Sequence, residues 1–134
     1  MAASSDELLD IRSSADVVAV RQAARALAEL AGLSLVDQTK LVTAASELAR
    51  NTLNYGGGGT VRLETVENGI RRGVRLTFED AGPGIANVAE ALKDGFTTGN
   101  GLGLGLGGAR RLVNDFAIES APGQGTRVTI VRWK

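Results

Sequence analysis

Glycine is unevenly distributed along this chain, and its clusters decide where regular structure can form. Of the 134 residues, 18 are glycine, about twice the roughly 7% that is usual in proteins. They gather at residues 56–59, at Gly82 and Gly84, and in a run of seven between Gly95 and Gly108. Because glycine has no side chain, its clusters favour turns and close approaches of the backbone. We therefore expect helices and strands that are separated by glycine-rich loops.

Apolar residues in the first third of the chain follow helical spacing. One helix is predicted from a cap at Ser14 or Asp16 to about Ala31, and a second from Ser34 to Tyr55. The expected apolar stripe of the first helix consists of Val17, Val20, Ala24, Leu27 and Leu30. Ser34 is followed three residues later by an acidic residue, which strengthens the second helix start.

Later in the chain the spacing changes to that of strands. Residues 61–65 and 74–80 alternate around an Asn-Gly turn signal and predict a hairpin. Further strands are predicted at residues 8–12, 116–120 and 126–133, with a short helix at about residues 87–93 and another that has Ala109, Leu112 and Val113 on its buried side. Helices that interrupt strands in this order predict an α+β fold, a two-layer α/β sandwich with a mixed, mainly antiparallel sheet. We expect a single domain over residues 1–134.

Composition removes several classes of function. Fifteen basic and fifteen acidic residues cancel, so no broad field favours nucleic acid or an anionic membrane. The chain has no Cys and no His, so nucleophilic triads, zinc sites and phosphohistidine chemistry cannot be built within it. Residues 1–16 do not show the basic region and apolar core that a signal peptide would have, and no apolar run approaches the length of a membrane span. We expect a cytoplasmic protein that binds neither nucleic acid nor membrane.

Two polar residues share one face of the second predicted helix. Glu47 and Asn51 are four positions apart, so they lie one turn from each other. A carboxylate and an amide so placed can hold a divalent cation or position a nucleophile, and Mg²⁺ prefers such oxygen ligands. Taken alone, the pair is more readily explained as part of a solvated helix face.

A second motif follows the predicted strand that ends at Asp80. In Glu79-Asp80-Ala81-Gly82-Pro83-Gly84 the strand fixes the position of the Asp80 carboxylate. Gly82 and Gly84 let a flat ligand approach the backbone without meeting a side chain. An acceptor beside such a surface suits an adenine amino group, although a plain turn after a strand is the alternative.

A third motif is the glycine-rich run that opens the helix near Ala109. Unhindered backbone N–H groups before a helix suit phosphate binding, and the alternative is a hinge without a ligand. The run contains a G-x-G-x-x-G match, but the preceding strand and the later acidic residue of a dinucleotide fold are missing. No Gly-Lys-Ser/Thr sequence occurs, so a Walker A loop is excluded.

The order and spacing of these motifs resemble the ATP site of the Bergerat-fold (GHKL, HATPase_c) superfamily, which includes gyrase, Hsp90, histidine kinases and MutL. The resemblance also includes the sequence Gly-x-Gly-Thr before the last strand and covers nearly the whole chain. Within the superfamily the chain is most similar to RsbT-like serine/threonine-protein kinases, and next to anti-sigma-factor kinases of the RsbW and SpoIIAB type. Residues 46–51, 79–85, 94–96 and 123–126 carry this similarity.

The resemblance implies a role for each motif residue. Glu47 would be the general base, Asn51 would hold Mg²⁺ against the phosphates of ATP, and Asp80 would accept the adenine amino proton. Gly82 and Gly84 would form the wall beside the base. The phosphate-covering lid would consist of Gly101, Gly103 and Gly105, and Thr126 would make a water-linked contact to adenine. Phosphoryl transfer needs mainly such positioning and charge neutralisation.

Partners follow only from the resemblance. It implies that the substrate is a STAS-domain protein similar to RsbS or RsbR, in a stressosome-type switch. It also implies that the kinase binds and thereby activates a PP2C-type phosphatase similar to RsbU. The alternative within the fold is an anti-sigma kinase, which sequesters a sigma factor and phosphorylates an anti-anti-sigma protein. In many of those kinases a His follows the Asn by four residues, where this chain has Tyr55. A nucleotide-binding module without catalysis is a further alternative, which the presence of Glu47 disfavours.

Overall fold

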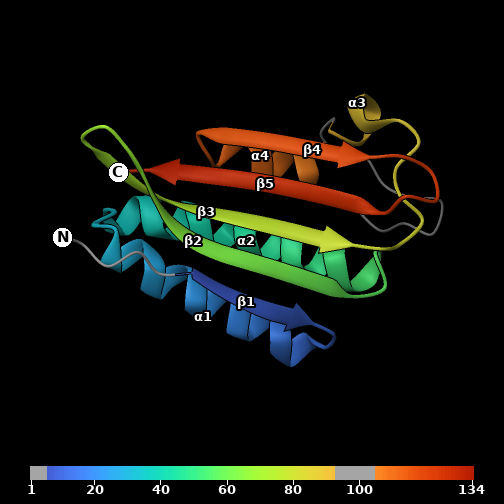
Figure 1. Ribbon diagram of the computed structural model, residues 1–134, viewed down its shortest axis with the longest axis horizontal. Helices are drawn as coiled ribbons and strands as arrows, with labels where there is room; N and C mark the ends of the chain where they lie inside the picture. The colour runs from blue at the N-terminus through green and yellow to red at the C-terminus, as the bar shows by residue number, and fades with distance from the viewer. Residues whose placement is uncertain (1–5, 93–104) are drawn as a thin grey trace.

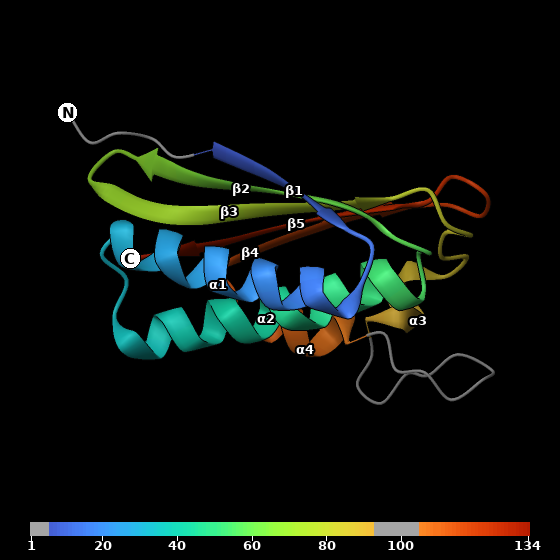
Figure 2. The same cartoon turned by 90° about the horizontal axis from the view of Figure 1, so that it is seen from below.

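In the part of the chain that the structure describes, a five-stranded sheet carries the helices on one of its faces and has no helix on the other (Figure 1; Figure 2). The computed structural model describes residues 6–92 and 105–134. Within them the strand order is β1-β2-β3-β5-β4, and every neighbouring pair is antiparallel. The predicted α+β fold with two layers is confirmed, and the sheet, which was predicted to be mixed and mainly antiparallel, is entirely antiparallel in the described residues. The strands are β1 (Asp6–Ile11), β2 (Gly59–Asn68), β3 (Arg71–Asp80), β4 (Asp115–Ser120) and β5 (Thr126–Trp133).

Two long helices form most of the second layer. They are α1 (Ser14–Leu30) and α2 (Leu35–Asn54). The Ser34 hydroxyl accepts a bond from the backbone N of Asp37 at 3.1 Å, which confirms the predicted cap of α2. The prediction for α1 was wrong, because Ser13 rather than Ser14 or Asp16 is its cap. The Ser13 hydroxyl accepts from the backbone N of Asp16 at 3.3 Å, so the helix starts one residue after Ser13.

Two short helices complete this layer, α3 (Val88–Ala91) and α4 (Leu106–Arg111). Ala109 in α4 is fully buried, as predicted. Leu112 and Val113 lie just beyond the end of α4 and are only partly buried against the core. None of the helices in the described part of the chain is long and apolar enough to cross a membrane.

The core lies between the sheet and the helices α1 and α2. Alternate residues of the central strands point into it, including the fully buried Leu63, Leu76 and Ile130. One predicted core residue was wrong: Leu30 is 50% exposed, while Ala31 is buried. Ala31 is four residues after Leu27 and so continues the stripe of α1, whereas the helix ends at Leu30 with that side chain turned outward.

The uncovered face of the sheet is polar. Ion pairs join neighbouring strands there, with N···O distances of 2.9 Å for Arg62 and Asp6 and 3.1 Å for Arg75 and Glu64. Because many of the outward residues are charged and paired, this face can remain in water without a covering layer.

Candidate functional site

One row of residues crosses the end of the sheet where β3 stops. Cα pairing places Gly59 opposite Asp80, Asp80 opposite Thr126, and Thr126 opposite Ser120. These residues come from β2, β3, β5 and β4. Asp80 is two positions after the buried Phe78 on β3, and Thr126 is two positions before the buried Val128 on β5. Their side chains therefore belong to the helix-bearing side of the sheet.

The carboxylate of Asp80 lies half-buried at the end of β3. One of its oxygens accepts a bond from the backbone N of Gly82 at 2.9 Å. Burial raises the pKa of Asp80, and backbone hydrogen bonds from Gly82 and Thr126 oppose that rise by favouring the charged form. The sequence thus places an acceptor, partly removed from water, where it was predicted.

The glycines around Asp80 allow three loops to meet without side chains between them. A Cβ on Gly56 would lie 2.4 Å from Cγ of Asp80, and one on Gly82 would lie 2.7 Å from the Cα of Gly56. Gly84 has a φ of +75°, and a Cβ there would meet the carbonyl oxygen of Ala121 at 2.0 Å. Contacts within the protein therefore already require glycine at positions 82 and 84. Their predicted role beside a base stays a prediction.

Two hydroxyl groups whose contacts the sequence reasoning did not predict hold these loops. The Tyr55 hydroxyl, at the end of α2, donates to the carbonyl oxygen of Gly84 at 2.8 Å. The Ser120 hydroxyl accepts from the backbone N of Ile85 at 2.8 Å and lies 2.8 Å from the hydroxyl of Thr126. The signal for Ser120 was its place at the end of a predicted strand, beside the Gly-x-Gly-Thr motif that begins the next one.

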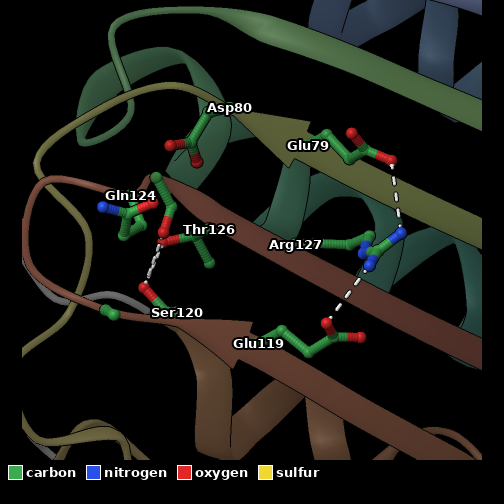
Figure 3. A pocket seen from close by; sticks show the side chains of 9 residues that line it. Glu79, Asp80, Glu119, Ser120, Gln124, Thr126 and Arg127 are labelled. Atoms are coloured by element: carbon green, nitrogen blue, oxygen red, sulfur yellow. Dashed lines mark hydrogen bonds and ion pairs between the residues drawn. The ribbon is translucent and has the colours of Figure 1, made fainter.

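A pocket of about 470 Å³ opens at this end of the sheet (Figure 3). Asp80, Thr126 and Ser120 line it, and charged residues of the uncovered face close its other side. Arg127 lies there between Glu119, at 3.1 Å, and Glu79, at 4.0 Å. The remaining lining residues are Ala121, Gln124 and Gly125.

Glu47 and Asn51 lie on α2, one turn apart as predicted. The Glu47 carboxylate accepts a hydrogen bond from the guanidinium of Arg50, and its side chain is 40% exposed. A Cβ on Gly105 would lie 2.7 Å from Oε2 of Glu47, so the residue that precedes α4 packs directly against this carboxylate. The Asn51 side chain is half-buried and has no hydrogen-bond partner among residues 6–92 and 105–134.

The structure thus brings the predicted residues together in two groups. Asp80, Gly82, Gly84 and Thr126 meet at the end of the sheet, while Glu47, Asn51 and Gly105 lie where α2 passes the start of α4. The last turn of α2 joins the groups, since the backbone N of Gly56 donates to the carbonyl of Asn51 at 3.1 Å.

Two predicted residues of the lid, Gly101 and Gly103, lie outside the described residues. Within residues 6–92 and 105–134, no group of three or more His, Cys, Asp and Glu side chains could hold a metal ion. Mg²⁺ commonly takes one or two protein oxygens and fills its shell with water and phosphate. An accessible amide such as Asn51 fits that mode of binding.

Comparison with known proteins identifies the family. Residues 36–134 match the model of the histidine kinase-, DNA gyrase B- and HSP90-like ATPases. The chain belongs to this ATPase family. It is 42% identical to the serine/threonine-protein kinase RsbT of Bacillus subtilis over 118 residues, which are 88% of this chain and 89% of that protein. It is 33% identical to the anti-sigma F factor of Bacillus licheniformis over 102 residues, 70% of this chain and 68% of that protein.

A solved structure agrees with this assignment at the level of the fold. The chain is similar, with a TM-score of 0.65, to a crystal structure of the RsbU and RsbW domains of a Mycobacterium tuberculosis protein. The identity is 23%, and the match covers 98% of this chain but only 33% of the other. The recognition of an RsbT-like member of the ATPase family, made on the motif residues, is confirmed.

Proposed function

We propose that this protein is an ATP-dependent serine/threonine-protein kinase that phosphorylates a STAS-domain partner in a stressosome-type switch. The observation that carries the proposal is the position of Glu47. It lies one turn before Asn51 on α2 and against Gly105 of the predicted phosphate lid. A carboxylate beside the predicted phosphate region is suited to proton transfer, which a module that only binds nucleotide does not need.

The residues at the end of the sheet fit an adenine base. Asp80 offers a half-buried acceptor, and Thr126 offers a hydroxyl in the next position of the same row. We propose that these groups bind the base, that Gly82 and Gly84 flank it, and that Gly101, Gly103 and Gly105 cover the phosphates. Asn51 would hold Mg²⁺. When bound, ATP and Mg²⁺ supply the transferred phosphoryl group and the charge that neutralises it.

Glu47 would accept the proton of the partner's serine or threonine hydroxyl. Its carboxylate is paired with Arg50 and must turn at least one oxygen toward that hydroxyl. A second pocket, of about 230 Å³, is lined by Glu47 and by other residues of α1 and α2. Arg21, Val42 and Ser46 are among its lining residues, so a side chain from another protein has room to reach Glu47.

The partners are inferred from the relatives. An RsbT-like kinase that acts on an RsbS- or RsbR-like STAS protein would also bind and activate a PP2C-type, RsbU-like phosphatase. Because ATP is a metabolite of the cytoplasm, we place the protein there. The similarity to anti-sigma F factors supports a second candidate, a kinase that also sequesters a sigma factor. RsbT is preferred because the match covers 89% of its length, against 68% for the anti-sigma F factor.

Phosphorylation of a STAS partner tests the role of Glu47. Radiolabelled ATP with Mg²⁺ should label a STAS protein encoded near this gene. Glu47→Gln and Glu47→Ala should lower the transfer rate by roughly 10² to 10⁴ fold, the range for loss of a general base, while ATP affinity stays nearly constant. Asn51→Ala should lower both rate and affinity, because the metal links the protein to the phosphates.

Glu29→Ala is the matched control, since Glu29 is an exposed glutamate on α1 and should leave both quantities unchanged. Wild-type transfer by the Glu47 variants would show that this carboxylate is structural. Failure of the wild type to label any STAS protein, together with tight capture of a sigma factor, would favour the second candidate.

A further inference from the structure

The hydroxyl of Ser120 has three polar neighbours, and their chemistry fixes which of them receives its proton. The backbone N of Ile85 can only donate, and it lies 2.8 Å from Ser120 Oγ. The carbonyl oxygen of Gly125 can only accept, and it lies at 2.9 Å. The third neighbour is the hydroxyl of Thr126 at 2.8 Å, which can do either.

Only one arrangement of protons satisfies all four groups. Ser120 has a single proton, and Gly125 has no other hydrogen-bond donor among the described residues. If Ser120 donates to Gly125, its two lone pairs accept from Ile85 and from the hydroxyl of Thr126. In the opposite arrangement the carbonyl of Gly125 loses its partner, which costs free energy in a part-buried position.

This arrangement has a consequence for the pocket at the end of the sheet. Thr126 is only 6% exposed, and its proton is committed to Ser120, so it faces the pocket with lone pairs alone. Asp80, the next residue in the row, is also an acceptor when ionised. Two adjacent hydrogen-bond acceptors favour a ligand whose facing edge carries hydrogen-bond donors.

We infer that Ser120 is a specificity-determining positioning residue, which by orienting the Thr126 hydroxyl makes this site prefer a 6-amino purine over a 6-oxo purine. The inference rests on the proposed nucleotide-binding function and adds Ser120 to it. Adenine presents an amino donor at this position, directly or through a water, whereas hypoxanthine and guanine present a carbonyl acceptor. Gln124, whose amide can donate or accept, also lines the pocket but is not part of the row.

The test compares the affinities of the full chain for ATP and ITP, two nucleotides that differ at this position. The wild type should bind ATP more tightly. In Ser120→Ala the Thr126 proton is released and can turn toward a carbonyl group, so the ratio of the ITP and ATP dissociation constants should fall by about five- to tenfold, the effect of one hydrogen bond. Part of the fall should be an absolute gain in ITP affinity, which general damage to the loops cannot produce.

Two further variants keep the test decisive. Ser120→Cys preserves the shape but accepts hydrogen bonds weakly, so it should lower the same ratio even if Ser120→Ala does not fold. Ser120→Thr keeps the hydroxyl and should restore the wild-type ratio. A ratio that stays constant in Ser120→Ala and Ser120→Cys would overturn the role of Ser120 and leave the proposed function intact. A wild type that binds neither nucleotide would overturn the proposed function itself.

Discussion

The carboxylate of Asp80 lies half-buried between the ends of β3 and β5, and this position has opposite effects on stability and on binding. Burial raises its pKa, so the folded state takes up a proton more readily than the unfolded chain. The ionised carboxylate therefore lowers the stability of the fold at neutral pH. This loss disappears as the pH falls through the raised folded-state pKa and below the ordinary pKa of 3.8.

Asp80→Asn should consequently leave the fold slightly more stable at pH 7, by less than about 1 kcal/mol because the group keeps solvent contact and backbone donors. ATP affinity should fall by about 10- to 150-fold, the loss of a charge-assisted bond. Urea unfolding at pH 7 and at pH 4, with calorimetric titration of ATP, measures both effects. Unchanged ATP affinity in Asp80→Asn would remove this residue from the site.

An ion pair holds the start of α2 to the last strand. Arg132 of β5 donates to the Asp37 carboxylate at 2.7 Å, and both side chains are mostly buried, with 16% and 25% of their areas exposed. The hydrogen bond with Arg132 is the main cause that lowers the pKa of Asp37. Arg132 also reaches the carbonyl of Leu112 just beyond α4, at 3.4 Å, so this contact joins α2, β5 and the end of α4.

Asp37→Asn should destabilise the protein by about 1 to 3 kcal/mol at pH 7, because a buried guanidinium loses its charged partner. A carboxylate whose pKa is lower in the folded state than in the unfolded state stabilises the fold at pH values above the unfolded-state pKa. This stabilisation is lost as the pH falls through the folded-state pKa. The difference between wild type and variant should therefore shrink in acid. Thermal unfolding of both proteins between pH 7 and about pH 2 measures this difference in stability. Glu29→Gln, a change at an exposed residue, is the control. A stability difference that does not depend on pH would contradict the role of the charge.

The elements that could be predicted are those whose signals are local. The start of α2, with its cap at Ser34, and the turn between β2 and β3 are each encoded within a few residues, and both are present. The cap of α1 was misplaced because several neighbouring polar residues can cap equally well. The hydroxyl contacts of Tyr55 and Ser120 span 29 and 35 residues, and no spacing in the sequence predicts which distant loops meet.

The whole site depends on contacts between distant parts of the chain, so ligand binding should stabilise the whole fold. Asp80 and Thr126 are paired strand residues, and Tyr55 ties α2 to the loop after β3. Saturation with ATP and Mg²⁺ at about 100 times the dissociation constant should add about 2.7 kcal/mol and raise the melting temperature by several degrees. Differential scanning calorimetry at several ATP concentrations measures this, and Asp80→Asn should need far more ATP for the same shift. A melting temperature independent of ATP would contradict nucleotide binding at this site.

The row that holds Asp80 and Thr126 is at one end of the sheet, and the chain enters and leaves the sheet away from it (Figure 1). Asp6 pairs with Glu64, five positions from the row, and Trp133 pairs with Gly73, seven positions from it. At about 3.4 Å per residue these separations are roughly 17 and 24 Å. A fluorophore or surface tether attached next to Asp6 or Trp133 would therefore hold the molecule with its pocket facing free solution, an orientation suited to surface-based measurement of partner binding.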